Sequence, residues 1–91
     1  MKNSHEIKRK LAESLELPKD IILDIPKITM IGDIQMNIEN HKGIIEYTNN
    51  CIRIKIKDGI LKIMGKNLLL KIILKDEIVI IGKIQQVEFT L

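Results

Sequence analysis

Few side chains in this 91-residue sequence are of the types that carry out chemistry. His5 and His41 have no cysteine or acidic residue at metal-ligand spacing, and the chain contains no C-x-x-C or H-E-x-x-H motif. His41 falls in a turn signal, where a solvated side chain is expected. Cys51 stands at the start of an alternating segment, where a half-buried thiol is more typical than a nucleophile. The sequence therefore predicts a non-enzymatic protein without a metal or cofactor.

A stripe of basic residues is a better candidate for binding, and we call it the basic stripe: Arg53, Lys55, Lys57 and Lys62. It has two interpretations, a solvated face or a contact for an anionic partner such as an acidic protein patch or lipid headgroups. Nucleic acid is not expected, because no aromatic residue is interleaved to stack on bases and the net charge is only +3.

The register of this stripe depends on the turn signal Asp58-Gly59, the strongest hairpin signal in the chain. A two-residue turn there would place Ile56 opposite Leu61 on the buried side. The same register would place Lys55 opposite Lys62 on the solvent side, where like charges are mildly destabilising.

The last third of the chain carries apolar residues at consecutive positions, in segments 68–74 and 78–81. An antiparallel sheet in a small monomer normally keeps one face polar. Either the N-terminal helices cover the second face or another chain does, and we expect a homo-oligomer or a protein partner. The candidate interaction surface is formed by Leu69, Ile73, Val79 and Ile81.

The first 26 residues are predicted to be helical. Residues 4–16 form an expected helix, capped by Asn3, with a thin apolar stripe at every fourth position: Ile7, Leu11 and Leu15. Pro18 is suited to the first turn of a short second helix, and Pro26 ends it. The basic residues 8–10 allow at most a peripheral membrane contact.

From residue 27 onward the pattern changes to the alternation of β-strands. Three segments, 28–36, 61–69 and 78–86, share a pattern of apolar residues around a glycine, and their spacing predicts a corresponding kink near Asn49-Asn50. The glycines expected at kinks and turns are Gly32, Gly43, Gly59, Gly65 and Gly82.

The expected architecture is a single domain over residues 1–91, with a helical segment (1–26) and a β domain (27–91). The fold class is mainly β, a meander of about seven to eight short, glycine-kinked strands in a small sandwich or open barrel. The alternative is a short β-solenoid, since a near-constant repeat length is typical of one. A single cysteine, no signal peptide and no apolar run of spanning length indicate a cytoplasmic protein.

The segment ELPKDIILDIPKITMIGDIQMNIENHKGIIEY resembles the YabP/YqfC sporulation proteins of endospore-forming Firmicutes, the YqfC branch most closely. The resemblance covers residues 16–91 and continues through Gly65 and Gly82 to the final strand with Phe89. It implies a small protein of the mother cell, without catalytic residues, that helps to build the spore envelope.

The resemblance also implies a location in the mother-cell cytoplasm at the forespore membrane surface, beside a membrane-bound sporulation partner. On this basis we expect an interaction or assembly module. A peripheral membrane or anionic-lipid-binding adaptor is the alternative. The polar set Glu39, Asn40 and His41 is expected to stabilise a local turn rather than to form a contact surface.

Overall fold

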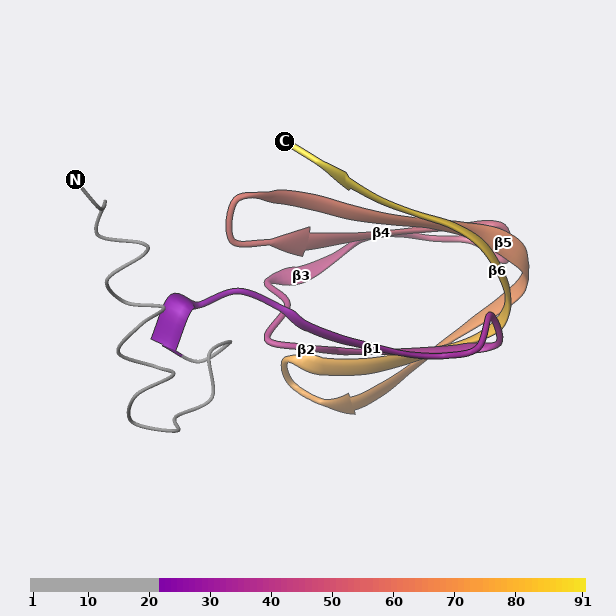
Figure 1. Ribbon diagram of the computed structural model, residues 1–91, viewed down its shortest axis with the longest axis horizontal. Helices are drawn as coiled ribbons and strands as arrows, with labels where there is room; N and C mark the ends of the chain where they lie inside the picture. Colours follow the sequence, from indigo (N-terminus) through magenta and orange to yellow (C-terminus); the bar gives the residue numbers. More distant parts are fainter. Residues whose placement is uncertain (1–21) are drawn as a thin grey trace.

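The computed structural model describes residues 22–91, which form one six-stranded antiparallel sheet folded over on itself (Figure 1). The strands follow the order β1-β2-β6-β5-β4-β3 across the sheet. The prediction of a mainly β fold is confirmed. The solenoid alternative is wrong, because successive coils of a β-solenoid run parallel whereas every strand pair here is antiparallel. The strands are β1 (Lys27–Ile31), β2 (Gln35–Glu39), β3 (Gly43–Tyr47), β4 (Cys51–Ile56), β5 (Gly59–Leu74) and β6 (Glu77–Thr90).

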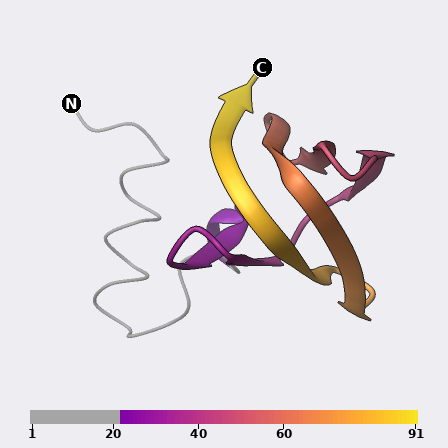
Figure 2. The same ribbon diagram turned by 90° about the vertical axis from the view of Figure 1, so that its right-hand side faces the viewer.

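Two long strands, β5 and β6, form a hairpin that bends halfway and carries the sheet from one layer into the other (Figure 2). In the first layer, β1 and β2 continue into residues 77–81 of β6 and 69–74 of β5. In the second layer, β3 and β4 continue into residues 59–64 of β5 and 86–90 of β6. Each layer is therefore built from one short hairpin and half of the long one.

The corners of the chain meet at the same end of the molecule, on the right of Figure 1. There the turn of each short hairpin accepts two backbone hydrogen bonds from the bend of a long strand. The four bonds are Gly65 N to Asn50 O (3.0 Å), Leu68 N to Asn49 O (2.8 Å), Gly82 N to Ile34 O (3.1 Å) and Ile84 N to Asp33 O (2.7 Å). The repeat seen in the sequence thus corresponds to four corners: Gly65 and Gly82 bend β5 and β6, whereas Gly32 and Asn49-Asn50 lie in hairpin turns, where a kink had been predicted near Asn49-Asn50.

The predicted number of seven to eight short strands is wrong. Gly65 and Gly82 bend their strands without ending them, because the backbone N–H of each still donates a hydrogen bond at the corner. Gly82 has a φ of 142°, and a Cβ at this position would lie 2.6 Å from the carbonyl oxygen of Asn67. Gly32, with a φ of 50°, lies in the β1–β2 turn. It is therefore a turn residue and not a kink within a strand.

The predicted helix over residues 4–16 and the beginning of the second helix lie outside the described residues. Residues 22–24 make a helical turn that ends before Pro26, with Asp24 at a φ of 56°. Leu23 is the buried side chain of this turn, whereas Ile22 and Ile25 are half-buried. No full helix is present within residues 22–91.

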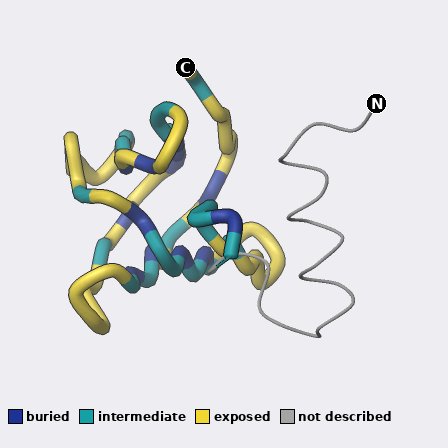
Figure 3. The backbone as a smooth tube through the Cα atoms, turned by 90° about the vertical axis from the view of Figure 1, so that its left-hand side faces the viewer, coloured by how far each residue is buried: buried dark blue, intermediate teal, exposed yellow. Residues whose placement is uncertain are grey.

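The core lies between the two layers, and buried residues alternate with more exposed ones along the strands that form it (Figure 3). Burying one such aliphatic side chain stabilises the fold by about 1.5–3 kcal/mol. The largest fully buried side chains are Met36, Ile38, Ile52, Ile54, Leu61, Ile63, Ile78 and Ile80.

The sheet does not close into a barrel. β1 and β3 are its outer strands, and residues 69–74 and 86–90 each pair with a strand on one side only. On one open side the phenol oxygen of Tyr47 in β3 accepts a hydrogen bond from the Leu70 amide in β5, at 3.0 Å. A side chain here takes the place that a neighbouring strand would fill in a closed barrel.

Candidate interaction surfaces

An apolar row crosses the outer face of the first layer. Leu69 lies opposite Ile81, Ile81 lies opposite Gln35, and Gln35 lies opposite Ile31. Leu69, Ile81 and Ile31, which we call the outer apolar row, are 48%, 37% and 50% exposed. Directly opposed side chains share a face of a sheet. The sheet thus holds the outer apolar row toward solvent, on strands whose inner residues form the core.

The candidate surface predicted from the sequence is divided by the structure. Leu69, Val79 and Ile81 lie on the same outer face, with Val79 half-buried and opposite Lys71. Ile73 does not join them, because the β5–β6 register shifts between residues 72 and 74 and places it near the tip of the hairpin. Ile31 was missed, since its membership of the row depends on a strand order that the sequence does not reveal.

The turn between β4 and β5 differs from the prediction. Residues 57–58 form it, and Ile56 lies opposite Gly59. A two-residue type I′ turn at Asp58-Gly59 would need a positive φ at both residues, and neither has one. Gly59 instead begins β5 against β6, where a Cβ would lie 2.2 Å from the Thr90 carbonyl oxygen.

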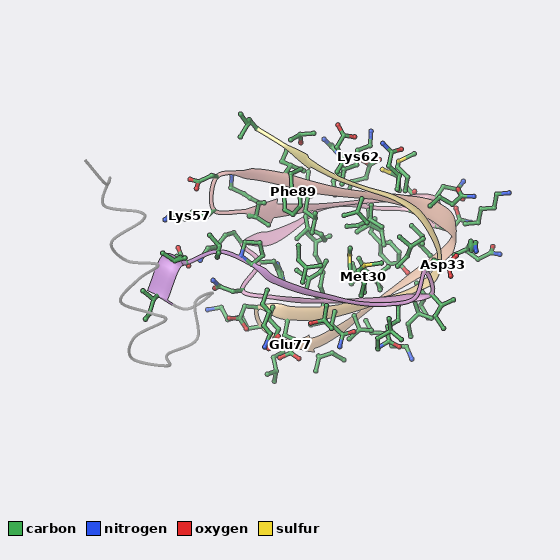
Figure 4. All side chains as sticks on the ribbon, in the orientation of Figure 1. Met30, Asp33, Lys57, Lys62, Glu77 and Phe89 are labelled. Carbon is green, nitrogen blue, oxygen red and sulfur yellow. The ribbon has the colours of Figure 1, made fainter. Side chains whose placement is uncertain are left out.

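The basic stripe is consequently arranged differently. Arg53 lies opposite Lys62, whereas Lys55 lies opposite Ile60, so the predicted Lys55–Lys62 pair is wrong. Figure 4 shows Lys62 on the outer side of the second layer. Lys57 lies in the turn, and its ammonium group donates a hydrogen bond to the Leu23 carbonyl at 3.2 Å. The structure therefore brings Arg53, Lys55 and Lys62 onto one face. It directs Lys57 toward residues 22–26, the segment before β1, which we call the N-terminal junction.

Acidic residues flank this stripe on both sides. Arg53 Nε lies 2.7 Å from Glu46 Oε1 in the neighbouring strand, and Glu88 lies opposite Lys62. Across the four strands of the second layer the order of charges is therefore negative, positive, positive, negative, and the two outer carboxylates lower the positive potential that an anionic partner would meet. Glu46 and Glu88 come from β3 and β6, and only the strand order places them there.

The polar residues after β2 tie the N-terminal junction to the sheet. The Asn40 side-chain amide donates hydrogen bonds to the Ile25 carbonyl at 3.0 Å and to Asp24 Oδ1 at 3.3 Å. Lys42 Nζ lies 2.6 Å from the same Asp24 oxygen. The hydrogen bonds from Lys42 and then Asn40 lower the pKa of the Asp24 carboxyl below its ordinary value. These Asn40 hydrogen bonds link the β2–β3 connection to a segment distant in the sequence, whereas the expected role was in the local turn.

His41 is buried and not solvated, contrary to expectation. Its Nδ1 accepts a hydrogen bond from the Gly43 amide at 2.9 Å, so the proton of the neutral ring is assigned to Nε2. This Nε2 atom is buried without a hydrogen-bond partner among the described residues. His41 therefore acts as a buried support of the β2–β3 connection.

Groups of three or more histidine, cysteine, aspartate or glutamate side chains that could hold a metal ion do not occur in residues 22–91. Cys51 is half-buried, with Sγ 3.9 Å from Glu46 Oε1. In the same part of the chain no helix is long and apolar enough to cross a membrane.

The model of the YabP family matches residues 24–91. This chain belongs to the YabP family. The match begins at Asp24 in the N-terminal junction and includes all six strands. The outer apolar row and the basic stripe of this YabP-family protein therefore both lie within the shared region. A protein of Bacillus subtilis (strain 168) named "Uncharacterized protein YqfC" is 39% identical over 85 residues, which cover 93% of this chain and 91% of that protein. No solved structure matches the chain. The resemblance inferred from the sequence is confirmed.

Proposed function

We propose that this YabP-family protein is a non-enzymatic interaction and assembly module in spore formation, and that it self-associates through the outer apolar row. The supporting observation is the exposure of Leu69, Ile81 and Ile31 in one row across the outer face of the first layer, with Gln35 between Ile81 and Ile31. The outer face of an antiparallel sheet in a small monomer is normally polar. Covering these side chains with another copy would remove apolar surface from water at about 25 cal/mol per Å².

The cellular setting of this proposal comes from the family. The YabP/YqfC resemblance supports action in the mother cell, in the building of the spore envelope at the forespore membrane surface. A membrane-bound sporulation protein is the partner that this setting suggests. The exposed row gives such a partner, or a second copy, a rigid apolar surface to contact.

Sedimentation equilibrium tests the proposal. We expect the wild-type protein to form oligomers and the variant Leu69→Thr/Ile81→Thr to be a monomer, because threonine keeps the β propensity and removes the apolar contact. The matched control is Lys55→Thr/Lys62→Thr on the outer face of the second layer, which should associate as the wild type does. A monomeric wild type, or a Leu69→Thr/Ile81→Thr variant that associates normally, would contradict the proposal.

The second candidate function is an adaptor that binds anionic lipid through the basic stripe. It is favoured by the position of Arg53, Lys55 and Lys62 on one face, although Glu46 and Glu88 oppose it. It predicts binding to phosphatidylserine vesicles that weakens with salt and is lost in Lys55→Glu/Lys62→Glu. Equal binding to neutral phosphatidylcholine vesicles would end this alternative.

A further inference from the structure

An apolar groove opens between the start of β1, the β4–β5 turn and the end of β6. Its volume is about 310 Å³. Its lining residues are Ile25, Pro26, Ile56, Lys57, Asp58 and Phe89. The groove lies at the end of the molecule between the two layers and shares no residue with the outer apolar row, so the two surfaces are separate.

Phe89 lines this groove and remains exposed to solvent. It lies opposite the fully buried Leu61 and so belongs to the inner face of the second layer, yet it is 63% exposed. Residues 86–90 form an edge of that layer, and no strand pairs with their free side. This exposure leaves apolar surface of the inner face in water, and another apolar group packed on it would remove that surface.

The N-terminal segment of the same chain, residues 1–21, is a candidate to cover the groove. Residues 1–21 join the described structure at Ile22, three residues before Ile25 in the groove. The junction is fixed, because Leu23 is buried, Lys57 donates a hydrogen bond to its carbonyl, and Asp24 is held by Lys42. The N-terminal segment must therefore leave from beside the groove.

The sequence of this segment supplies the apolar side chains that the groove lacks. Ile7, Leu11 and Leu15 recur at every fourth position, which places them on one face if the segment is helical. A stripe this thin does not stabilise an isolated helix in water, so it needs a surface to pack on. Six residues lie between Leu15 and Ile22, and an extended chain spans about 3.3–3.6 Å per residue, so this linker is long enough to return Leu15 to the groove that Ile25 and Phe89 line.

We propose that the apolar groove is the docking site for the N-terminal segment of the same chain, with Ile7, Leu11 and Leu15 packed on Phe89, Ile25 and Pro26. This contact covers the open edge at residues 86–90 and leaves the outer apolar row free. It does not depend on the assembly proposed above, and a protein that is monomeric throughout can show it.

The absence of tryptophan from the chain allows a direct optical test on the full-length protein. In Phe89→Trp the indole reports on the groove, and we expect blue-shifted emission. Adding Ile7→Gln/Leu11→Gln/Leu15→Gln should shift the emission to the red, as water reaches the indole. The matched control changes three residues between the apolar positions: Lys8→Gln/Lys10→Gln/Glu13→Gln. It should leave the spectrum unchanged, and equal spectra for all three proteins would overturn the proposal.

Cross-linking identifies the occupant. In a Cys51→Ser background, Leu11→Cys and Phe89→Cys are joined by a short bismaleimide at low protein concentration. We expect an intramolecular product in at least fivefold excess over the control pair Leu11→Cys with Lys62→Cys, whose second site lies on the outer face. Equal yields for the two pairs would overturn the proposal. Products that join two differently tagged copies would also overturn it, by assigning the groove to a second chain.

Discussion

Gly82 offers the sharpest test of the bend that divides the sheet into layers. Its φ of 142° is unfavourable for a residue with a side chain, and a Cβ would lie 2.6 Å from Asn67 O and 3.0 Å from Leu68 Cα. Backbone strain of this kind costs about 1–3 kcal/mol, and forced contact in a packed site costs about as much again. We therefore expect Gly82→Ala to lower the free energy of unfolding by roughly 4 kcal/mol, a large part of the stability of a small domain.

The β1–β2 turn supplies a matched control. Gly32 also has a positive φ, but nothing lies within 4 Å of a Cβ at its position. Gly32→Ala should therefore cost only the conformational term, about 1–2 kcal/mol. Urea titrations followed by far-UV circular dichroism give both values by linear extrapolation. If the two variants lose the same stability, the close approach of Gly82 to Asn67 is not what the bend requires.

Three further substitutions test the junctions of the sheet. The hydrogen bond from Lys42 lowers the pKa of the Asp24 carboxyl below its ordinary value of 3.8. The stability that this carboxylate contributes is therefore complete above pH 3.8 and is lost as the pH falls through the lowered pKa. Asp24→Asn should reduce the acid dependence of unfolding measured by circular dichroism. His41→Ala should cost about 2 kcal/mol, because a hydrogen bond and buried packing are both lost. Tyr47→Phe should accelerate hydrogen exchange at the Leu70 amide, whose acceptor disappears.

Each of these substitutions has its own control. Asp58→Asn, in the exposed β4–β5 turn, removes the same charge and should leave the acid dependence intact. His41→Asn can still accept a hydrogen bond and should cost about half as much as His41→Ala. Exchange at the Leu68 amide, which donates to the Asn49 carbonyl, should not change in Tyr47→Phe. Acid profiles, stabilities or exchange rates that do not separate in these ways would contradict the assigned contacts.

Local periodicity was sufficient to predict the inner faces of the sheet. The alternation over residues 52–56 identified core positions, as it did for Met36 and Ile38, whereas Ile34, expected on the same inner face, lies in the β1–β2 turn and is 59% exposed. The glycine spacing located the corners. The division into six strands was not predictable in this way. Gly65 and Gly82 interrupt the apolar pattern in the sequence, whereas in the structure their amides donate hydrogen bonds to the Asn50 and Ile34 carbonyls and the strands continue through them.

The candidate surfaces were less predictable than the core because they depend on which strands become neighbours. The basic stripe was visible in the sequence, whereas Glu46 and Glu88 are placed beside it only by the pairing of β3 with β4 and of β6 with β5. The same holds for Ile31 in the outer apolar row. The burial of His41 also could not be anticipated, because a turn residue is normally solvated and its local sequence gives no sign of the surrounding contacts.

Site-specific photo-cross-linking in sporulating cells most directly tests the claim that the outer apolar row is the contact surface. A photoreactive phenylalanine analogue is placed at Ile81, in the row, and separately at Lys62, on the outer face of the other layer. We expect cross-linked products, including the homodimer, from position 81 and none from position 62. Products of equal yield from both positions, or none from position 81, would contradict the account.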